Sequence, residues 1–137
     1  INDGERRGNN WGKGGTGSGW NDGTSGTYPD WVQITFSGVQ SISQINVYTL
    51  ADNFASLTAD PTSGSSFTKY GIVDFQVQYW TGTDWQNVPG GSITGNNLVL
   101  RSVSFAPINT DRIRVNITNA LYWNSRIVEL EAWTPSP

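Results

Sequence analysis

Apolar and polar residues alternate with a period of two along several separate stretches of this chain. Val32, Ile34 and Phe36 are each separated by one polar residue. The same alternation recurs over residues 44–48, 73–80, 112–117 and 128–133. A period of two is typical of a strand that buries one face, and no long stretch has a helical period. The sequence therefore predicts an all-β fold, an antiparallel β-sandwich or jelly roll with strands of about 5 to 8 residues.

Turn-forming residues separate these stretches. Residues 81–84 are expected to form a hairpin turn between Trp80 and Trp85, and Gly90 with Gly91 is expected to form another turn. Residues 1–30, which hold nine of the sixteen glycines, and residues 51–71 have no regular pattern. Loops of this length are usually functional or disordered. Because both contain aromatic residues together with Asn, Asp and Gly, we expect functional loops.

The length and the ends of the chain predict one module. A chain of 137 residues can bury a single core without disulfides. Residues 1–133 are expected to form this module, and residues 134–137, which contain two prolines and a serine, to begin a linker. We expect the module to belong to a longer, secreted polypeptide and to be extracellular.

The charge composition argues against partners with dense negative charge. Eight Lys and Arg residues are outnumbered by eleven Asp and Glu residues, which gives a formal net charge of −3. Binding to a nucleic-acid backbone or to an anionic membrane needs clustered positive charge. We therefore expect no nucleic-acid partner, and the lack of a run of about 18 apolar residues predicts no membrane insertion.

The common catalytic constellations are missing from the sequence. The chain has no His and no Cys, which excludes the usual nucleophile triads and zinc-hydrolase sites. Glu129 and Glu131 are two positions apart, about 7 Å along one face of a strand, which a glycosidase pair would permit. Because they lie on a strand and not in an aromatic loop, we expect that the protein is not an enzyme.

Several of the aromatic residues are expected to be structural. Trp31, at the entrance of a strand, and Phe75 and Tyr79, on an apolar face, are predicted to belong to the core. Trp80 and Trp85 flank a hairpin turn, where such residues pack across the turn or cover a sheet edge.

Loop aromatics are the candidates for a contact surface. Tyr122 and Trp123 are adjacent in a short loop, and two adjacent aromatics in a loop cannot easily both be buried. Trp11 and Trp20 lie in the glycine-rich first loop. Either residue can anchor this loop, and Trp20 is also a candidate platform for a ligand.

Five short segments form an ordered set along the chain. They are Asn2-Asp3-Gly4, Pro29-Asp30-Trp31-Val32-Gln33-Ile34, Phe75-Gln76-Val77-Gln78-Tyr79 followed by Trp85, Asp111-Arg112-Ile113-Arg114-Val115, and residues 125–133. Together they resemble the discoidin family, the coagulation factor type C group that includes family 32 carbohydrate-binding modules. The resemblance implies a galactose-binding-like jelly roll. Two features depart from the family: its usual first strand does not precede the Asp-Gly loop here, and its disulfide and frequent binding-site histidine are absent.

The resemblance also implies a structural calcium ion beside the Asp-Gly loop and the last strand. Calcium takes six to eight oxygen ligands, which carboxylates and the carbonyls of a glycine-rich loop can supply. Asp3 matches the family's loop aspartate, and Glu129 matches the glutamate of the closing strand. A second Asn-Asp-Gly sequence offers Asp22 as an alternative ligand. Each tripeptide is also a common turn sequence, so a simple turn remains the alternative.

Sugar binding is the function that the resemblance implies. A pyranose ring offers an apolar face and a rim of hydroxyls, which suit an aromatic platform beside amide, carboxylate or guanidinium groups. The loops that bind sugar in the family correspond here to Asp52 and Asn53 and to Tyr122, Trp123 and Asn124. Trp20 is a further platform. Arg126 is a candidate donor of paired hydrogen bonds, with an internal salt bridge as the alternative.

These observations predict a noncatalytic carbohydrate-binding module that targets an extracellular enzyme or adhesin to glycan. Its expected partners are an oligo- or polysaccharide and other modules of the same, bacterial polypeptide, and we expect a monomer. The alternative is a protein- or phospholipid-binding adhesion module of the discoidin type. Phospholipid binding favours loops with aliphatic tips that are surrounded by Lys and Arg. This chain has mostly Trp and Tyr instead, so we expect glycan binding to fit better.

Overall fold

The computed structural model describes residues 1–136, and strands make up nearly all of its regular secondary structure. The six strands are β1 (Trp20–Asn21), β2 (Asp30–Thr49), β3 (Ile72–Trp80), β4 (Trp85–Ile93), β5 (Leu100–Ala120) and β6 (Arg126–Trp133). Two single turns of 3₁₀ helix, η1 (Phe54–Ser56) and η2 (Leu121–Trp123), lie in loops. The predicted all-β fold is confirmed. No helix among the described residues is long and apolar enough to cross a membrane. The last residue of the predicted linker, Pro137, lies outside the described residues.

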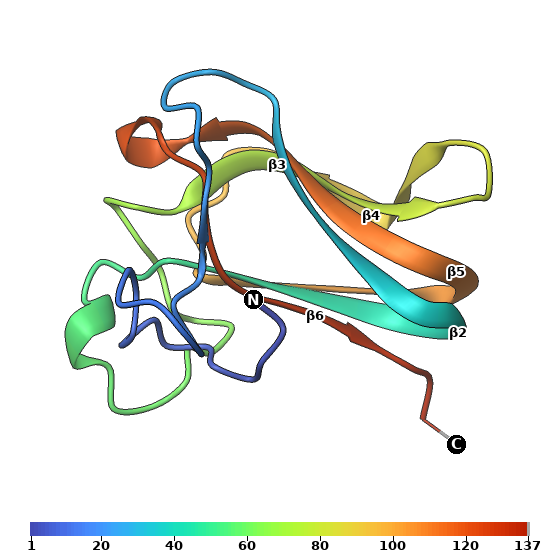
Figure 1. Ribbon diagram of the computed structural model, residues 1–137, viewed down its shortest axis with the longest axis horizontal. Coiled ribbons are helices and arrows are strands. Elements are labelled where there is room, and N and C mark those ends of the chain that lie inside the picture. Colours follow the sequence, from blue (N-terminus) through green and yellow to red (C-terminus); the bar gives the residue numbers. More distant parts are fainter. Residues whose placement is uncertain (137) are drawn as a thin grey trace.

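All six strands form one antiparallel sheet in the order β1-β6-β2-β5-β3-β4, and this sheet folds over itself. The reason is that β2 and β5 are long enough to belong to both layers (Figure 1). Residues 30–35 of β2 pair with residues 112–117 of β5, beside β3 and β4. Residues 44–48 of β2 pair with residues 100–104 of β5 on one side and with β6 on the other.

Irregular pairing bends the two long strands. The register of β2 against β5 shifts between Thr35 and Gln40 and again between Ile42 and Gln44. Such bulges twist a strand and redirect it, and Gly38 adopts a positive φ of 128° within the first shift. The sequence predicted two short strands where the structure has one strand of 20 residues. The predicted strand length was therefore wrong for β2 and for β5, although the inward faces were correct.

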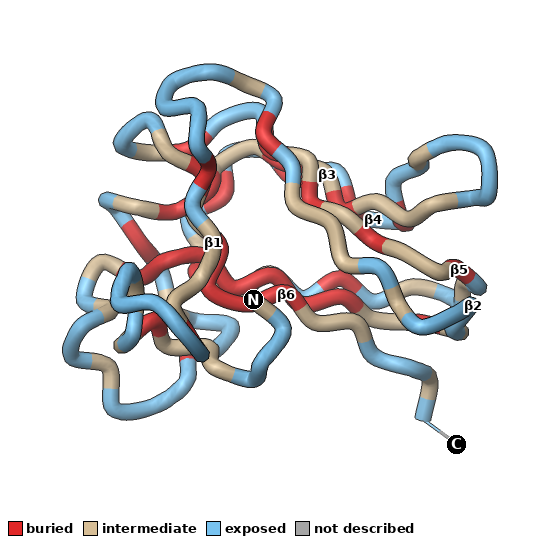
Figure 2. The backbone as a smooth tube through the Cα atoms, in the orientation of Figure 1, coloured by how far each residue is buried: buried red, intermediate tan, exposed pale blue. Residues whose placement is uncertain are grey.

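The core lies between the two layers. Apolar side chains from both layers are fully buried there, among them Ile45, Phe75, Ile113, Ile117 and Leu130. Each such side chain stabilises the fold by about 1.5 to 3 kcal/mol relative to exposure. In Figure 2 the buried positions follow the strands, and exposed positions gather in the loops.

Three predictions about individual positions need correction. Trp31 is not a core residue, because 54% of its surface is exposed and it lies on the face opposite to Val32. Gly90 and Gly91 do not end a strand but lie inside β4, where the register against β3 shifts. Val128 does not share a face with Leu130 as the alternation predicted.

The reason for the exception at Val128 is a bulge in β6. Tyr48 pairs with Glu129, but the next residue of β2, Thr49, pairs with Ile127. Val128 is therefore an extra residue in the ladder. Ile127 points into the main core, whereas Val128 packs with Tyr48 in a second buried cluster.

Candidate functional site

The most exposed aromatic pair of the chain is in η2, directly after β5. The side chains of Tyr122 and Trp123 are 60% and 70% exposed. Both residues have a left-handed backbone, with φ of 50° and 59°. A positive φ is uncommon for bulky residues, and such strain clusters at binding sites and active sites. The prediction that this pair forms an exposed surface is confirmed.

A hollow of about 300 Å³ lies beside this pair. It is lined by Thr68, Lys69, Leu121, Tyr122 and Trp123. The lining side chains are therefore mostly apolar, and their polar groups include the Lys69 ammonium and the hydroxyls of Thr68 and Tyr122.

The exposed rings continue a series of aromatic contacts that begins in the second long loop. The ring centroids of Phe54 and Tyr70 are 6.0 Å apart, those of Tyr70 and Tyr122 are 5.7 Å apart, and those of Tyr122 and Trp123 are 6.4 Å apart. Aromatic pairs at these separations attract one another. The second long loop, residues 51–71, and the short loop that carries Tyr122 and Trp123 therefore meet at one end of the sandwich.

Arg126 braces the aromatic loop from β6. Its Nη1 donates hydrogen bonds to the carbonyls of Leu121, at 3.2 Å, and Asn124, at 3.4 Å. Its guanidinium lies over the ring of Tyr70, 5.4 Å from the centroid. Burial lowers the pKa of Arg126. Among residues 1–136 it forms no salt bridge, so the predicted alternative of an internal ion pair is wrong.

Asp52 holds two of the residues that line the hollow. Its carboxylate accepts hydrogen bonds from the backbone amides of Thr68 and Lys69 and from the Thr68 hydroxyl. Burial acts to raise the pKa of Asp52, but these hydrogen bonds outweigh it and the pKa is lowered. Asn53, the next residue, is exposed. Asp52 therefore positions two residues of the hollow, and Asn53 faces solvent beside them.

Asn124 and Asp22 belong to a buried polar network under the aromatic loop. Asp22 Oδ1 accepts hydrogen bonds from the amide of Ser125 at 2.6 Å and from Asn124 Nδ2 at 3.2 Å. The hydroxyls of Thr24 and Ser125 donate to the buried Asp30. This network fixes the first loop to the start of β6. The Asn124 side chain is thus engaged within the protein.

Trp20 lies on β1 and pairs with Ile127 of β6. Its side chain is only partly exposed and packs against the main core. Of the two predicted roles, this position matches the anchor of the first loop.

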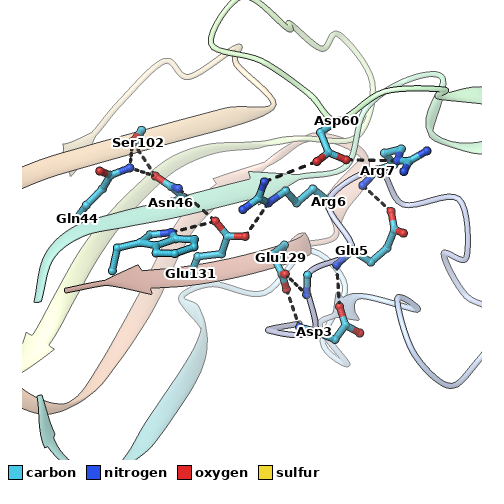
Figure 3. Close-up of polar contacts among 12 residues, drawn as sticks. Asp3, Glu5, Arg6, Arg7, Gln44, Asn46, Asp60, Ser102, Glu129 and Glu131 are labelled. Carbon is cyan, nitrogen blue, oxygen red and sulfur yellow. Dashed lines mark hydrogen bonds and ion pairs between the residues drawn. The ribbon is translucent and has the colours of Figure 1, made fainter. Parts of the chain in front are cut away.

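The structure brings Asp3 and Glu129 together, as Figure 3 shows. The Glu129 carboxylate accepts hydrogen bonds from the backbone amides of Asp3, at 3.1 Å, and Gly4. The Asp3 carboxylate accepts from the amides of Gly17, at 2.7 Å, and Glu5, at 3.1 Å. Asp22 lies elsewhere, in the network described above. The Glu129 carboxylate thus contacts the backbone of Asp3 and Gly4, whereas the Asp3 carboxylate is held by the amides of Glu5 and Gly17. Asp22 does not belong to this group.

The surroundings of Glu129 disfavour its charged form. Glu129 is only 1% exposed, and burial together with the nearby charge of Asp3 raises its pKa to about 7, against the amide hydrogen bonds that lower it. The Gly17 amide lowers the pKa of Asp3. Within residues 1–136 no cluster of three or more His, Cys, Asp or Glu side chains is present. A calcium ion here would take two carboxylates, and its other ligands would be backbone carbonyls of the glycine-rich loop or water.

No sequence pattern indicated that Thr68, Lys69 and Leu121 line the hollow. Thr68 and Lys69 are brought there by Asp52, 16 residues earlier, and no local pattern marks that contact. The aromatic residues of the second loop were the only available signal for this neighbourhood.

Comparison with solved structures identifies the fold. No family model and no curated protein matches the chain. Chitosan-binding module 1, derived from a chitosanase/glucanase of Paenibacillus sp. IK-5, is similar with a TM-score of 0.64 at 14% identity, over 88% of this chain and 79% of that one. The family 32 carbohydrate-binding module of Streptococcus pneumoniae EndoD has a TM-score of 0.61 at 12% identity, over 86% and 76%. This chain has the fold of the family 32 carbohydrate-binding modules.

A third structure supports the same fold. The family 32 module of Clostridium perfringens NanJ, solved in complex with galactose, is similar with a TM-score of 0.60 at 16% identity, over 87% of this chain and 78% of that one. The family 32 fold matches the resemblance expected from the sequence segments. At these identities the likeness concerns the fold, and the ligand has to be argued from the side chains.

Proposed function

We propose that this protein is a noncatalytic carbohydrate-binding module whose ligand site is the aromatic end of the sandwich. One observation carries the proposal: Tyr122 and Trp123 are held exposed, in a strained backbone, beside a hollow. Exposed rings held by a strained backbone beside a hollow are typical of a binding surface.

The side chains around the hollow fit a sugar. The face of a pyranose ring is apolar and can stack on the Trp123 indole, whereas its hydroxyls need hydrogen-bond partners. The Thr68 hydroxyl and the Lys69 ammonium line the same hollow, and Asn53 is exposed on the neighbouring loop. Because the hollow is shallow, each single contact is expected to be weak, with avidity supplied by neighbouring modules.

The similar proteins support the proposal. One is a chitosan-binding module derived from a chitosanase/glucanase, and another was solved in complex with galactose. By analogy, we assign to this chain the targeting of an extracellular enzyme or adhesin to glycan.

A structural calcium ion is part of the proposal. Asp3 and Glu129 would hold it, with loop carbonyls as further ligands. The ion would neutralise a buried carboxylate and lock the first loop against β6. Thermal unfolding with calcium and with a chelator tests this part without any sugar.

A glycan array with and without the chelator tests the sugar site. We expect binding to a subset of glycans, lost in Trp123→Ala. Phosphatidylserine vesicles serve as the probe for the adhesion alternative. Binding to these vesicles, without binding to any glycan, would replace the proposal by that alternative.

A further inference from the structure

The outer face of the layer formed by β2, β5, β3 and β4 carries a second set of aligned polar and aromatic side chains. Register places Gln33, Arg114, Gln78 and Asn87 in one row across the four strands. Neighbouring strands are about 4.8 Å apart, so the four groups follow one another at that interval. Trp31 lies on the same face one row away, on β2. None of these residues belongs to the aromatic loop.

Lateral contacts hold the row in place. Arg114 Nε donates to Gln78 Oε1 at 2.7 Å, and Gln78 Nε2 donates to Asn87 Oδ1 at 2.9 Å. The Arg114 guanidinium also lies over the ring of Trp85, 4.6 Å from its centroid. A guanidinium has five N–H groups and a side-chain amide has two, so each keeps donors for a ligand. The groups are thus preorganised, which lowers the cost of binding.

The charge of this face is not balanced within the described residues. Arg112 pairs with Asp111 at 2.9 Å, but Arg114 has no carboxylate within 4.0 Å in residues 1–136. A half-buried guanidinium without a carboxylate favours an anionic partner. This positive charge is conspicuous on a chain whose net charge is −3.

The shape of the face favours an extended ligand. The central row crosses four strands and does not line the hollow beside Tyr122 and Trp123. A second hollow, of about 290 Å³, lies at the margin of the row, beside Trp80 and Arg112. A small molecule would find no enclosure on the row, whereas a linear polymer can contact several strands at once. Trp31 is 54% exposed and offers a ring on which a sugar can stack.

We propose that this outer face is a second binding surface, for an extended polysaccharide that carries carboxylates. Carboxylates of the polymer would pair with Arg114, hydroxyls with the amides of Gln33, Gln78 and Asn87, and a sugar ring with Trp31. A nucleic acid is disfavoured, because its dense phosphate charge requires more cations than this face has. The inference does not rest on the sugar site at the aromatic loop, which lies at another part of the sandwich.

Affinity gel electrophoresis with polygalacturonate tests the surface in a Trp123→Ala background, which removes the loop site. We expect retardation that weakens with added salt. Arg114→Gln removes the charge and keeps a planar amide, and should weaken binding about tenfold. Trp31→Ala should weaken it several-fold. Lys13→Gln makes the same charge change in an exposed loop and should have no effect.

Poly-glutamate and single-stranded DNA of matched length serve as probes for charge alone. Absence of polygalacturonate binding overturns the proposal. Equal binding of poly-glutamate or DNA, or equal losses in Arg114→Gln and Lys13→Gln, also overturns it. If thermal unfolding shows that Arg114→Gln does not fold, Trp31→Ala decides, because that side chain is exposed. Failure of the loop site would appear instead as a glycan array without Trp123-dependent binding.

Discussion

The guanidinium of Arg126 lies over the ring of Tyr70, 5.4 Å from its centroid, and joins the last strand to the second long loop. The same side chain holds two carbonyls of the aromatic loop. Tyr70 in turn contacts Tyr122, with 5.7 Å between the ring centroids. One partly buried cation therefore ties together two loops that carry the proposed sugar site.

Arg126→Ala is expected to lower the free energy of unfolding by about 1 to 3 kcal/mol and to weaken glycan binding. It removes hydrogen bonds from a charged donor and leaves the carbonyls of Leu121 and Asn124 without this partner. Urea denaturation and binding titration measure the two effects. Arg126→Lys keeps the charge but cannot stack a planar group on Tyr70. It should therefore recover only part of the stability and part of the glycan affinity. Full recovery by Lys would show that the charge alone matters.

Trp123→Ala is expected to abolish glycan binding while changing the free energy of unfolding by less than about 0.5 kcal/mol, because the indole is exposed. Trp20→Ala is the matched comparison. Its side chain packs against the main core, so its loss should cost about 2 kcal/mol or more. Urea denaturation of both variants decides the roles. A large loss of stability in Trp123→Ala would assign that indole to the core.

Local patterns predicted the strands but not the way they join. The period of two gave the inward faces of β2 and β5, since burial of one face requires it. In β3 it was right for Phe75 and Val77 but wrong for Val73, because register shifts place Ile72 in the main core and Val73 in a separate cluster. It gave the wrong face for Val128, because a bulge adds a residue that only the pairing with Tyr48 and Thr49 reveals. Trp31 was predicted to be a core residue, and this was wrong, because the same period places it on the face opposite to Val32, where it is exposed.

The candidate site was predictable where two residues are adjacent and not where they are distant. Tyr122 and Trp123 could be identified because neighbouring loop rings cannot both be covered. The contact of Asp52 with Thr68 spans 16 residues, and that of Arg126 with Tyr70 spans more than 50. Such contacts depend on the packing of whole loops, which no short sequence segment specifies.

Gly19→Ala is expected to destabilise the protein by more than about 2 kcal/mol. Gly19 has a φ of 75°, and a Cβ there would overlap the ring of Trp11. Backbone strain and overpacking therefore add. Gly14→Ala is the control, because its φ is 78° and no atom lies within 4 Å of the added carbon. It should cost only about 1 kcal/mol. If urea denaturation gives the same loss of unfolding free energy for Gly19→Ala and Gly14→Ala, Trp11 does not anchor this loop.

The buried Glu129 predicts a pH dependence of stability in the absence of metal. Its pKa is raised from 4.5 to about 7 in the folded protein, chiefly by burial. Between these values the folded state keeps the proton and the unfolded state loses it. The contribution of protonated Glu129 to the free energy of unfolding is therefore fully present below about pH 4.5. It is lost as the pH rises through about 7. The loss is on the order of 3 kcal/mol.

Thermal unfolding in a chelator between pH 5 and pH 8 measures this loss as a decrease of several degrees in Tm. Glu129→Gln carries no titrating carboxyl at this position, so its Tm should vary less over the same range. Saturating calcium should restore the Tm of the unmodified protein at pH 8, because a cation beside Asp3 and Glu129 stabilises the ionised carboxylate. If calcium instead raises the Tm of Glu129→Gln by the same amount, the ion binds without Glu129, and the proposed metal site is wrong.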